Sequence, residues 1–163
     1  KLSLSPSVSA VIPTSEASQK RDKLITTLVL SPSFSYKINP TLTASYRPGM
    51  TSNFHEYKTN RVGTNLVKYK LSQSLGLGLS VSDQLSLSTS FSYLNAWSYG
   101  GTQRDPAYST GLSGSYLFKK DISFTLGLST VDALDATEKG PDKNIEIYNK
   151  DTTSYLASLA ITF

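Results

Sequence analysis

The sequence has no cysteine, no long apolar run and few charges for its length. The lack of cysteine excludes disulfides, cysteine-ligated zinc and thiol chemistry. No stretch approaches the roughly 18 consecutive apolar residues of a membrane-spanning helix, so a helical membrane protein is excluded. Charged residues are 17% of the chain, against roughly 25% in an average soluble protein. At 163 residues, the chain fits one domain, 1–163.

Alternation of polar and apolar residues is the dominant pattern. In QLSLSTSFSY, residues 84–93, serine takes every second place from Ser86 to Ser92. A period of two indicates strands whose two faces differ, and no stretch shows the 3.6-residue period of an amphipathic helix. We therefore expect an all-β chain. The pattern predicts eight strands, at about 2–12, 23–36, 41–48, 65–81, 85–98, 109–118, 122–131 and 152–163.

The connections between these strands alternate in length. Three are short turns, at 37–40, 82–84 and 119–121, and four are long, at 13–22, 49–63, 99–108 and 132–150. In an antiparallel meander, all long loops then lie at one end and all short turns at the other. All 12 carboxylates also fall in connections or beside them. This arrangement is typical of a transmembrane β-barrel, in which lipid-facing charge is costly.

Aromatic residues provide a second test of the membrane interpretation. With the apolar residues facing outward, one set collects near the long loops and another near the short turns. The first set is Tyr46, Tyr69, Tyr93, Trp97 and Tyr155, and the second is Phe34, Tyr36, Tyr116, Phe118, Phe124 and Phe163. Two such girdles are expected at the two membrane interfaces.

The last strand carries a family resemblance. It ends the chain on an aromatic residue, with apolar residues at each second position before it: Tyr155, Ala157, Leu159, Ile161 and Phe163. This resembles the C-terminal pattern of Gram-negative outer-membrane β-barrels, and the whole plan resembles small barrels of the OmpA membrane domain and OmpX type. The resemblance implies an eight-stranded antiparallel up-and-down barrel in the bacterial outer membrane, with short periplasmic turns and long extracellular loops. It also implies that the barrel-assembly machinery reads the final strand.

In such a barrel the serine residues face a narrow polar lumen, which their small side chains do not fill. Two interpretations stay open: a static wet core in a structural or surface-interaction protein, or a small-solute, porin-like pore. Arg47, Lys68 and Lys70 share the inward register, and we expect all three towards the long-loop end, which predicts a weak anion preference if the lumen conducts. Alternatively, Glu56 or another loop acid neutralises these cations.

Further alternatives concern partners and catalysis. Basic residues in the long loops are candidates to bind lipopolysaccharide phosphates or a surface partner, and no basic stripe supports nucleic-acid binding. A lipid-A-modifying enzyme would need His55, the single histidine, with a nucleophile such as Ser52. We expect no enzyme activity, cofactor or metal. A soluble lipid-binding barrel, with the apolar face inward, is the other rival.

Prolines at Pro6 and Pro32 occupy matching contexts, LSPSVS and LSPSFS. Proline removes a hydrogen bond from a sheet and belongs at edges or bulges. We therefore expect either bulges or a lateral opening at these two positions.

Overall fold

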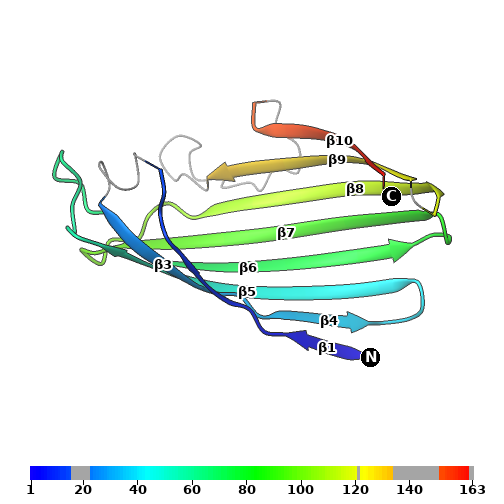
Figure 1. Ribbon diagram of the computed structural model, residues 1–163, viewed down its shortest axis with the longest axis horizontal. Helices are drawn as coiled ribbons and strands as arrows, with labels where there is room; N and C mark the ends of the chain where they lie inside the picture. The colour runs from blue at the N-terminus through cyan, green and yellow to red at the C-terminus, as the bar shows by residue number, and fades with distance from the viewer. Residues whose placement is uncertain (16–22, 121, 134–150, 162–163) are drawn as a thin grey trace, which may run out of the picture.

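A single antiparallel sheet makes up the computed structural model, which describes residues 1–15, 23–120, 122–133 and 151–161 (Figure 1). The strands are β1 (Leu2–Ser5), β2 (Val8–Val11), β3 (Leu24–Leu30), β4 (Ser33–Lys37), β5 (Leu42–His55), β6 (Val67–Ser80), β7 (Leu85–Ser98), β8 (Ala107–Lys119), β9 (Ile122–Ala133) and β10 (Thr153–Ile161). The predicted all-β antiparallel class is confirmed. The described residues include no helix long and apolar enough to cross a membrane.

Strand order follows the chain, but two of the predicted strands are each divided in two. β1 and β2 both lie against the second predicted strand, which is itself split into β3 and β4, and both of these pair with β5. From β5 to β10, each strand pairs with the next. The sheet therefore has 10 strands, where the sequence predicted eight, because Pro6 and Pro32 interrupt the first two.

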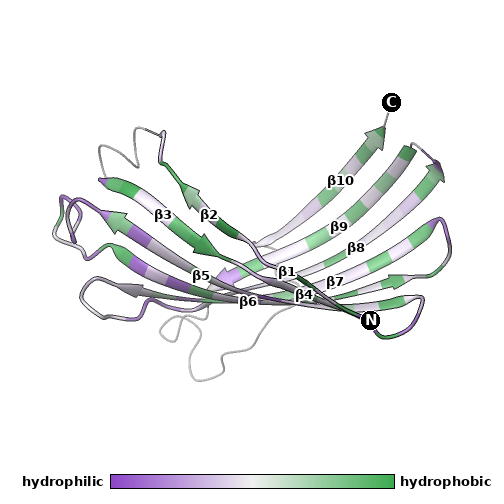
Figure 2. Cartoon of the chain, turned by 60° about the horizontal axis from the view of Figure 1, so that its bottom comes forward, coloured by the Kyte–Doolittle hydropathy of each residue, from purple (hydrophilic) through white to green (hydrophobic). Residues whose placement is uncertain are grey.

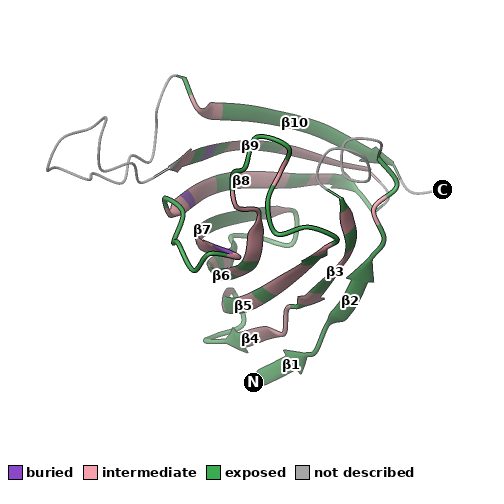
Figure 3. Cartoon of the chain, turned by 90° about the vertical axis from the view of Figure 1, so that its left-hand side faces the viewer, coloured by how far each residue is buried: buried purple, intermediate pink, exposed green. Residues whose placement is uncertain are grey.

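The sheet is curved but not closed. Figure 3 shows β1 and β2 at one margin and β10 at the other. Among the described residues, no pairing joins these two margins. The predicted closed eight-stranded barrel is thus not seen in this structure. Interruption by Pro6 leaves two strands of four residues at that margin, a short and divided edge for pairing.

Pro6 and Pro32 do not mark bulges. Leu4 pairs with Phe34 before the interruption and Val8 with Leu30 after it, so each strand advances by four residues and no extra residue is inserted. Register shifts occur elsewhere in the described sheet, between Leu24/Thr26, Val67/Tyr69 and Leu117/Lys119.

Strand β5 is longer than predicted. The segment RPGM at 47–50 was predicted to end a strand at 48 and begin the loop 49–63, but β5 continues to His55. Pairing with β3 on one side and β6 on the other stabilises this extension. Tertiary pairing therefore overrides the local turn preference of proline and glycine.

The two faces of the sheet differ in exposure, most clearly in β6. Tyr69, Leu71, Leu75, Leu77 and Leu79 are exposed, whereas the alternate residues from Lys68 to Gly78 are half-buried. Because the inner side of a curved sheet is the less exposed, we assign the serine-bearing face to the concave side. Figure 2 shows the alternating hydropathy along the strands. Among the described residues, Tyr108 is the one buried hydrophobic side chain, so the sheet has no ordinary apolar core.

Glycines opposite serines relieve crowding on the concave side. A Cβ added to Gly76 would lie 2.6 Å from Oγ of Ser45, its cross-strand partner. A Cβ added to Gly111 would lie 2.7 Å from Oγ of Ser90. Small residues on this face therefore suit the curvature of the sheet.

Candidate functional site: the serine face and its cations

We call the concave side the serine face, since cross-strand registers bring the alternating serines together on it. Its members include Ser3, Ser5, Ser33, Ser35, Ser45, Ser72, Ser74, Ser86, Ser88, Ser90, Ser92, Ser113, Ser115, Ser129, Ser154 and Ser158. Hydroxyl pairs 2.7 Å apart join Ser74 to Ser92, Ser88 to Ser113 and Ser115 to Thr125. Such cross-strand bonds stabilise the sheet and leave a surface that is polar but uncharged.

Cations interrupt this neutral surface: Lys37 at the end of β4, and the three predicted lumen cations Arg47, Lys68 and Lys70. Arg47 lies opposite Ser74, and Lys70, four positions before Ser74 in β6, lies opposite Thr51. That spacing puts Arg47 and Lys70 about 13 Å apart along the strand direction. The prediction that all three cations lie towards the long loops is therefore wrong for Arg47, which sits mid-strand because β5 extends to His55. It holds for Lys68 and Lys70, near the start of β6.

The expected neutralisation by Glu56 is not observed. One carboxylate oxygen of Glu56 lies 3.8 Å from Nζ of Lys23. A hydrogen bond with Glu56, together with its negative charge, raises the pKa of the Tyr57 hydroxyl above its usual value. Glu56 is thus engaged by its loop neighbours. Within the described part of the chain, no carboxylate lies in ion-pair range of Arg47, Lys68 or Lys70.

Lys68 belongs to an aromatic and polar cluster at the long-loop end. Its Nζ lies 4.6 Å from the ring centroid of Tyr69 and 5.7 Å from that of Tyr99. The Tyr99 hydroxyl donates to the backbone oxygen of Asn53 at 2.9 Å and accepts from the backbone N–H of His55 at 3.2 Å. Cation–π contacts hold the ammonium without neutralising it. Sequence patterns did not reveal this cluster, because Tyr99 and Asn53 meet only through pairing of distant segments.

His55 packs against Tyr99 and does not lie beside Ser52, the nucleophile that a catalytic role would need. His55 and Tyr99 pack edge to face, with ring centroids 5.7 Å apart. Ser52 lies three positions before His55 in the same extended strand, so the two side chains point to opposite faces. The structure does not bring this pair together. Among the described residues, no group of three or more His, Cys, Asp or Glu side chains could hold a metal ion.

The predicted aromatic girdles are brought together only in part. Tyr69 pairs with Trp97, and Tyr116 packs 4.9 Å from Phe118 and pairs with Phe124. Phe34 and Tyr46, however, were assigned to opposite girdles, yet they are cross-strand partners with centroids 6.3 Å apart. The assignment fails for this pair because β5 continues to His55, so Tyr46 no longer lies at the long-loop end of its strand. Tyr36 and Tyr155 are exposed, and Tyr93 pairs with Tyr108.

Residues of the expected assembly signal share one face of β10. Tyr155, Ala157, Leu159 and Ile161 pair with Leu128, Leu126, Phe124 and Ile122 of β9. Phe163 lies outside the described residues, as do parts of the loops 13–22 and 132–150. The assembly role of these residues stays a prediction.

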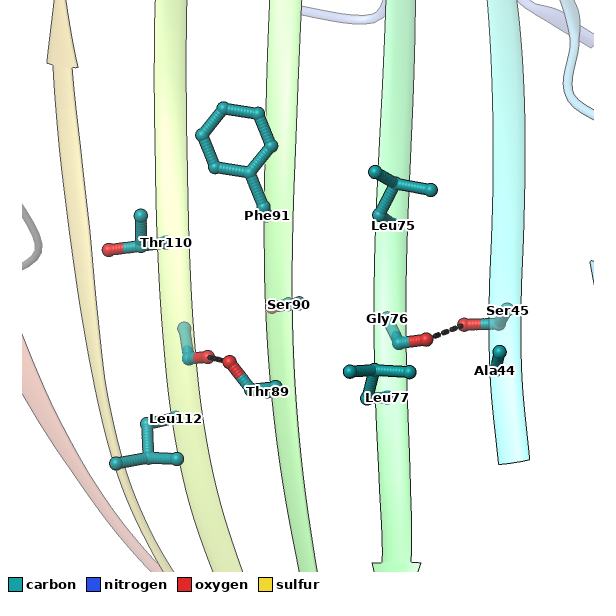
Figure 4. Close-up of a pocket in the computed structure, with 11 residues that line it drawn as sticks. Ala44, Ser45, Leu75, Gly76, Leu77, Thr89, Ser90, Phe91, Thr110 and Leu112 are labelled. Atoms are coloured by element: carbon teal, nitrogen blue, oxygen red, sulfur yellow. Dashed lines mark hydrogen bonds between the residues drawn. The ribbon is translucent and has the colours of Figure 1, made fainter. Parts of the chain in front are cut away.

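A shallow hollow lies on the opposite, apolar face (Figure 4). Its volume is about 650 Å³, and its walls include Leu75, Leu77, Phe91 and Leu112. Gly76 and Gly111 help form its floor. The hollow suits hydrocarbon and offers little to a polar ligand.

Comparisons with protein-family models, with curated proteins and with solved structures found no match.

Proposed function

We propose that the chain is an integral outer-membrane β-barrel, in which the margin formed by β1 and β2 pairs with β10 and the serine face encloses a narrow polar lumen. The apolar face then contacts lipid. Closure would supply partners for the edge N–H and C=O groups, which a hydrocarbon environment demands. The barrel serves as a structural or surface-interaction protein through its long loops.

The single observation that carries this proposal is the inverted distribution of polarity. Leu75, Leu77, Leu112 and Leu126 are each about half exposed, while serines on the other face of β6 are half-buried. A soluble protein rarely exposes contiguous apolar patches above a few hundred Å². Lipid is the environment in which an exposed leucine band is favourable. The soluble rival, with its apolar face inward, requires the reverse exposure.

Partition into membranes tests the proposal. We expect the protein to refold into lipid vesicles, float with them in a density gradient, and show a heat-dependent shift of mobility in gels. A water-soluble form, monomer or dimer, that stays at the bottom of the gradient in the presence of vesicles would contradict it.

Unneutralised cations favour a second candidate function, an anion-preferring pore for small solutes. Arg47, Lys68 and Lys70 have no carboxylate partner among the described residues. In a narrow lumen with few mobile ions, such charges act strongly on a passing ion. Planar-bilayer recording separates the two functions, because well-inserted protein that does not conduct leaves only the structural role.

We predict that replacing Lys68 and Lys70 with Gln lowers the anion preference of any conductance and leaves folding intact. Lys70 lies on the polar face, and Lys68 is the unpaired residue at the register shift beside Tyr69, so the free energy of unfolding should change by no more than about 1 kcal/mol. Reversal potentials in a salt gradient provide the measurement. The control is Lys58→Gln with Arg61→Gln, an equal loss of charge in the loop after β5. An equal shift in this control would show that the selectivity does not arise in the lumen.

Partners follow from the same proposal. Outer-membrane lipid surrounds the barrel, the basic loop residues bind lipopolysaccharide phosphates, and the barrel-assembly machinery reads β10 during biogenesis. Among described loop cations, Arg104 is already committed, since its Nη2 donates to the backbone oxygen of Asn65 at 2.7 Å. Lys58 and Arg61 are better placed for phosphate, because both are exposed.

A further inference from the structure

Three prolines form one row across the sheet. The registers on either side of the interruption place Pro6 opposite Pro32 and Pro32 opposite Pro48. Pro48 in turn pairs with Gln73 of β6. The interruption at Pro6 and Pro32 is therefore one end of a row that continues into the unbroken strand β5.

The alternating direction of backbone hydrogen bonds along the strands shows which bonds these prolines remove. The N–H of Ser31 donates to Ser7 at 2.9 Å, towards the first strand, and the N–H of Ile38 donates to Leu42 at 2.9 Å, towards β5. Backbone N–H groups alternate in direction along a strand, so the nitrogen of Pro32 faces β5. Pro48 occupies the opposing position, and neither residue has an N–H. Both hydrogen bonds of this pair are absent.

A hollow lies over this pair on the apolar face. Its volume is about 270 Å³, and Leu30, Tyr46, Met50 and Leu71 line it with both prolines. Gln73 also lines it and places an exposed amide in an otherwise apolar surface. The outer side of the interrupted pair therefore accepts hydrocarbon and offers one polar group.

Beside the Pro32–Pro48 pair, on the serine face of the sheet, lies a cation, Arg47. Arg47 precedes Pro48, so its side chain points to the serine face. It is exposed, and no carboxylate of the described residues pairs with it. A guanidinium binds a carboxylate through two parallel hydrogen bonds, which a lysine cannot do.

We propose that Pro32 and Pro48 form a passage through the wall that binds a long-chain carboxylate, with its head on Arg47 and its hydrocarbon chain in the hollow lined by Leu30 and Met50. This inference rests on the proposed membrane function, since it treats the sheet as a wall between a polar lumen and lipid. The missing hydrogen bonds lower the resistance to local separation of β5 from β3 and β4. Charge on one side and apolar surface on the other match the two ends of a fatty acid.

Binding of a fluorescent polyene fatty acid to the full chain, refolded in vesicles, tests the proposal. Arg47→Gln should weaken binding at least tenfold, and Met50→Trp, which fills the hollow, should do the same. The matched controls are Lys70→Gln, a cation on the same face, and Leu79→Trp, an exposed apolar-face residue outside the hollow. Both controls should bind within twofold of the wild type.

Each other outcome decides against the proposal. Equal weakening of binding by Arg47→Gln and Lys70→Gln would mean that the attraction is diffuse and electrostatic. Unchanged binding in Met50→Trp would show that the hydrocarbon chain of the fatty acid does not lie in the hollow. If a lysophospholipid competed as well as the free fatty acid, the site would not be specific for a carboxylate head group. Vesicle flotation, measured in the same samples, separates failure of this inference from failure of the proposed membrane function. Wild-type protein that floats but does not bind overturns this inference and leaves the membrane function standing.

Discussion

Leu112→Lys should lower the free energy of unfolding in lipid vesicles by about 2–4 kcal/mol, the cost of a lysine on the lipid side near the bilayer midplane. Leu112 lies near the middle of β8, on the apolar face, and is 53% exposed. In water, a substitution at such an exposed position changes stability by only about 0.5 kcal/mol in either direction. The size of the effect therefore reports the solvent that this face contacts. Fluorescence of Trp97, the single tryptophan, can follow the urea transition.

The matched control is the adjacent residue, Ser113, which points to the serine face. Ser113→Lys removes the hydroxyl pair with Ser88, 2.7 Å long, and should cost about 1 kcal/mol. A negligible effect at Leu112 would mean that water contacts both faces, and the membrane proposal would be wrong. A larger loss at Ser113 than at Leu112 would mean that the two faces are reversed.

Sequence periodicity predicted the features that depend only on neighbouring residues, such as the face of a strand to which each side chain points. Successive residues of a strand must point to opposite faces, so the alternation of serine with leucine places Ser88 and Leu87 on different sides without any knowledge of neighbours. Two short turns were predictable because brief polar segments separate alternating stretches: residues 38–41 join β4 to β5 and residues 81–84 join β6 to β7, and each joined pair of strands is hydrogen-bonded. In β6 and β7 the predicted limits nearly coincide with those observed.

Features that depend on distant pairing were not predictable. The segment RPGM has strong turn preferences, and nothing local indicates that β3 and β6 would hold it in a strand. The mid-strand position of Arg47 and the length of the loop that follows β5 both result from that one extension. The opposition of Pro32 and Pro48 has the same origin, because it requires the register between β4 and β5. The contact between Tyr99 and His55 joins residues 44 apart.

Closure of the sheet is the remaining difference between the expected barrel and the observed sheet, and it can be tested with disulfides. The chain has no cysteine, so paired substitutions introduce the only thiols. Backbone N–H groups of Lys37 and Ser31 donate to Lys1 and Ser7, so odd-numbered residues of β1 bond to the neighbouring strand. Across the free margin, odd-numbered residues would then form the non-hydrogen-bonded pairs, whose Cα atoms lie about 4.5 Å apart. That spacing lies within the range of a disulfide.

We predict that Ser5→Cys, combined in turn with cysteine at Ser154, Leu156, Ser158 or Ala160, forms an intramolecular disulfide at one of these positions after refolding in vesicles. All four lie on the serine face of β10, the side to which Ser5 points. Leu4→Cys in the same combinations is the control, because its side chain points to the apolar face. Non-reducing gels distinguish the products by mobility. A covalent dimer would show that the margins pair between two copies, and the absence of any disulfide, or equal yields with Leu4→Cys, would mean that β1 and β10 do not meet in a fixed register.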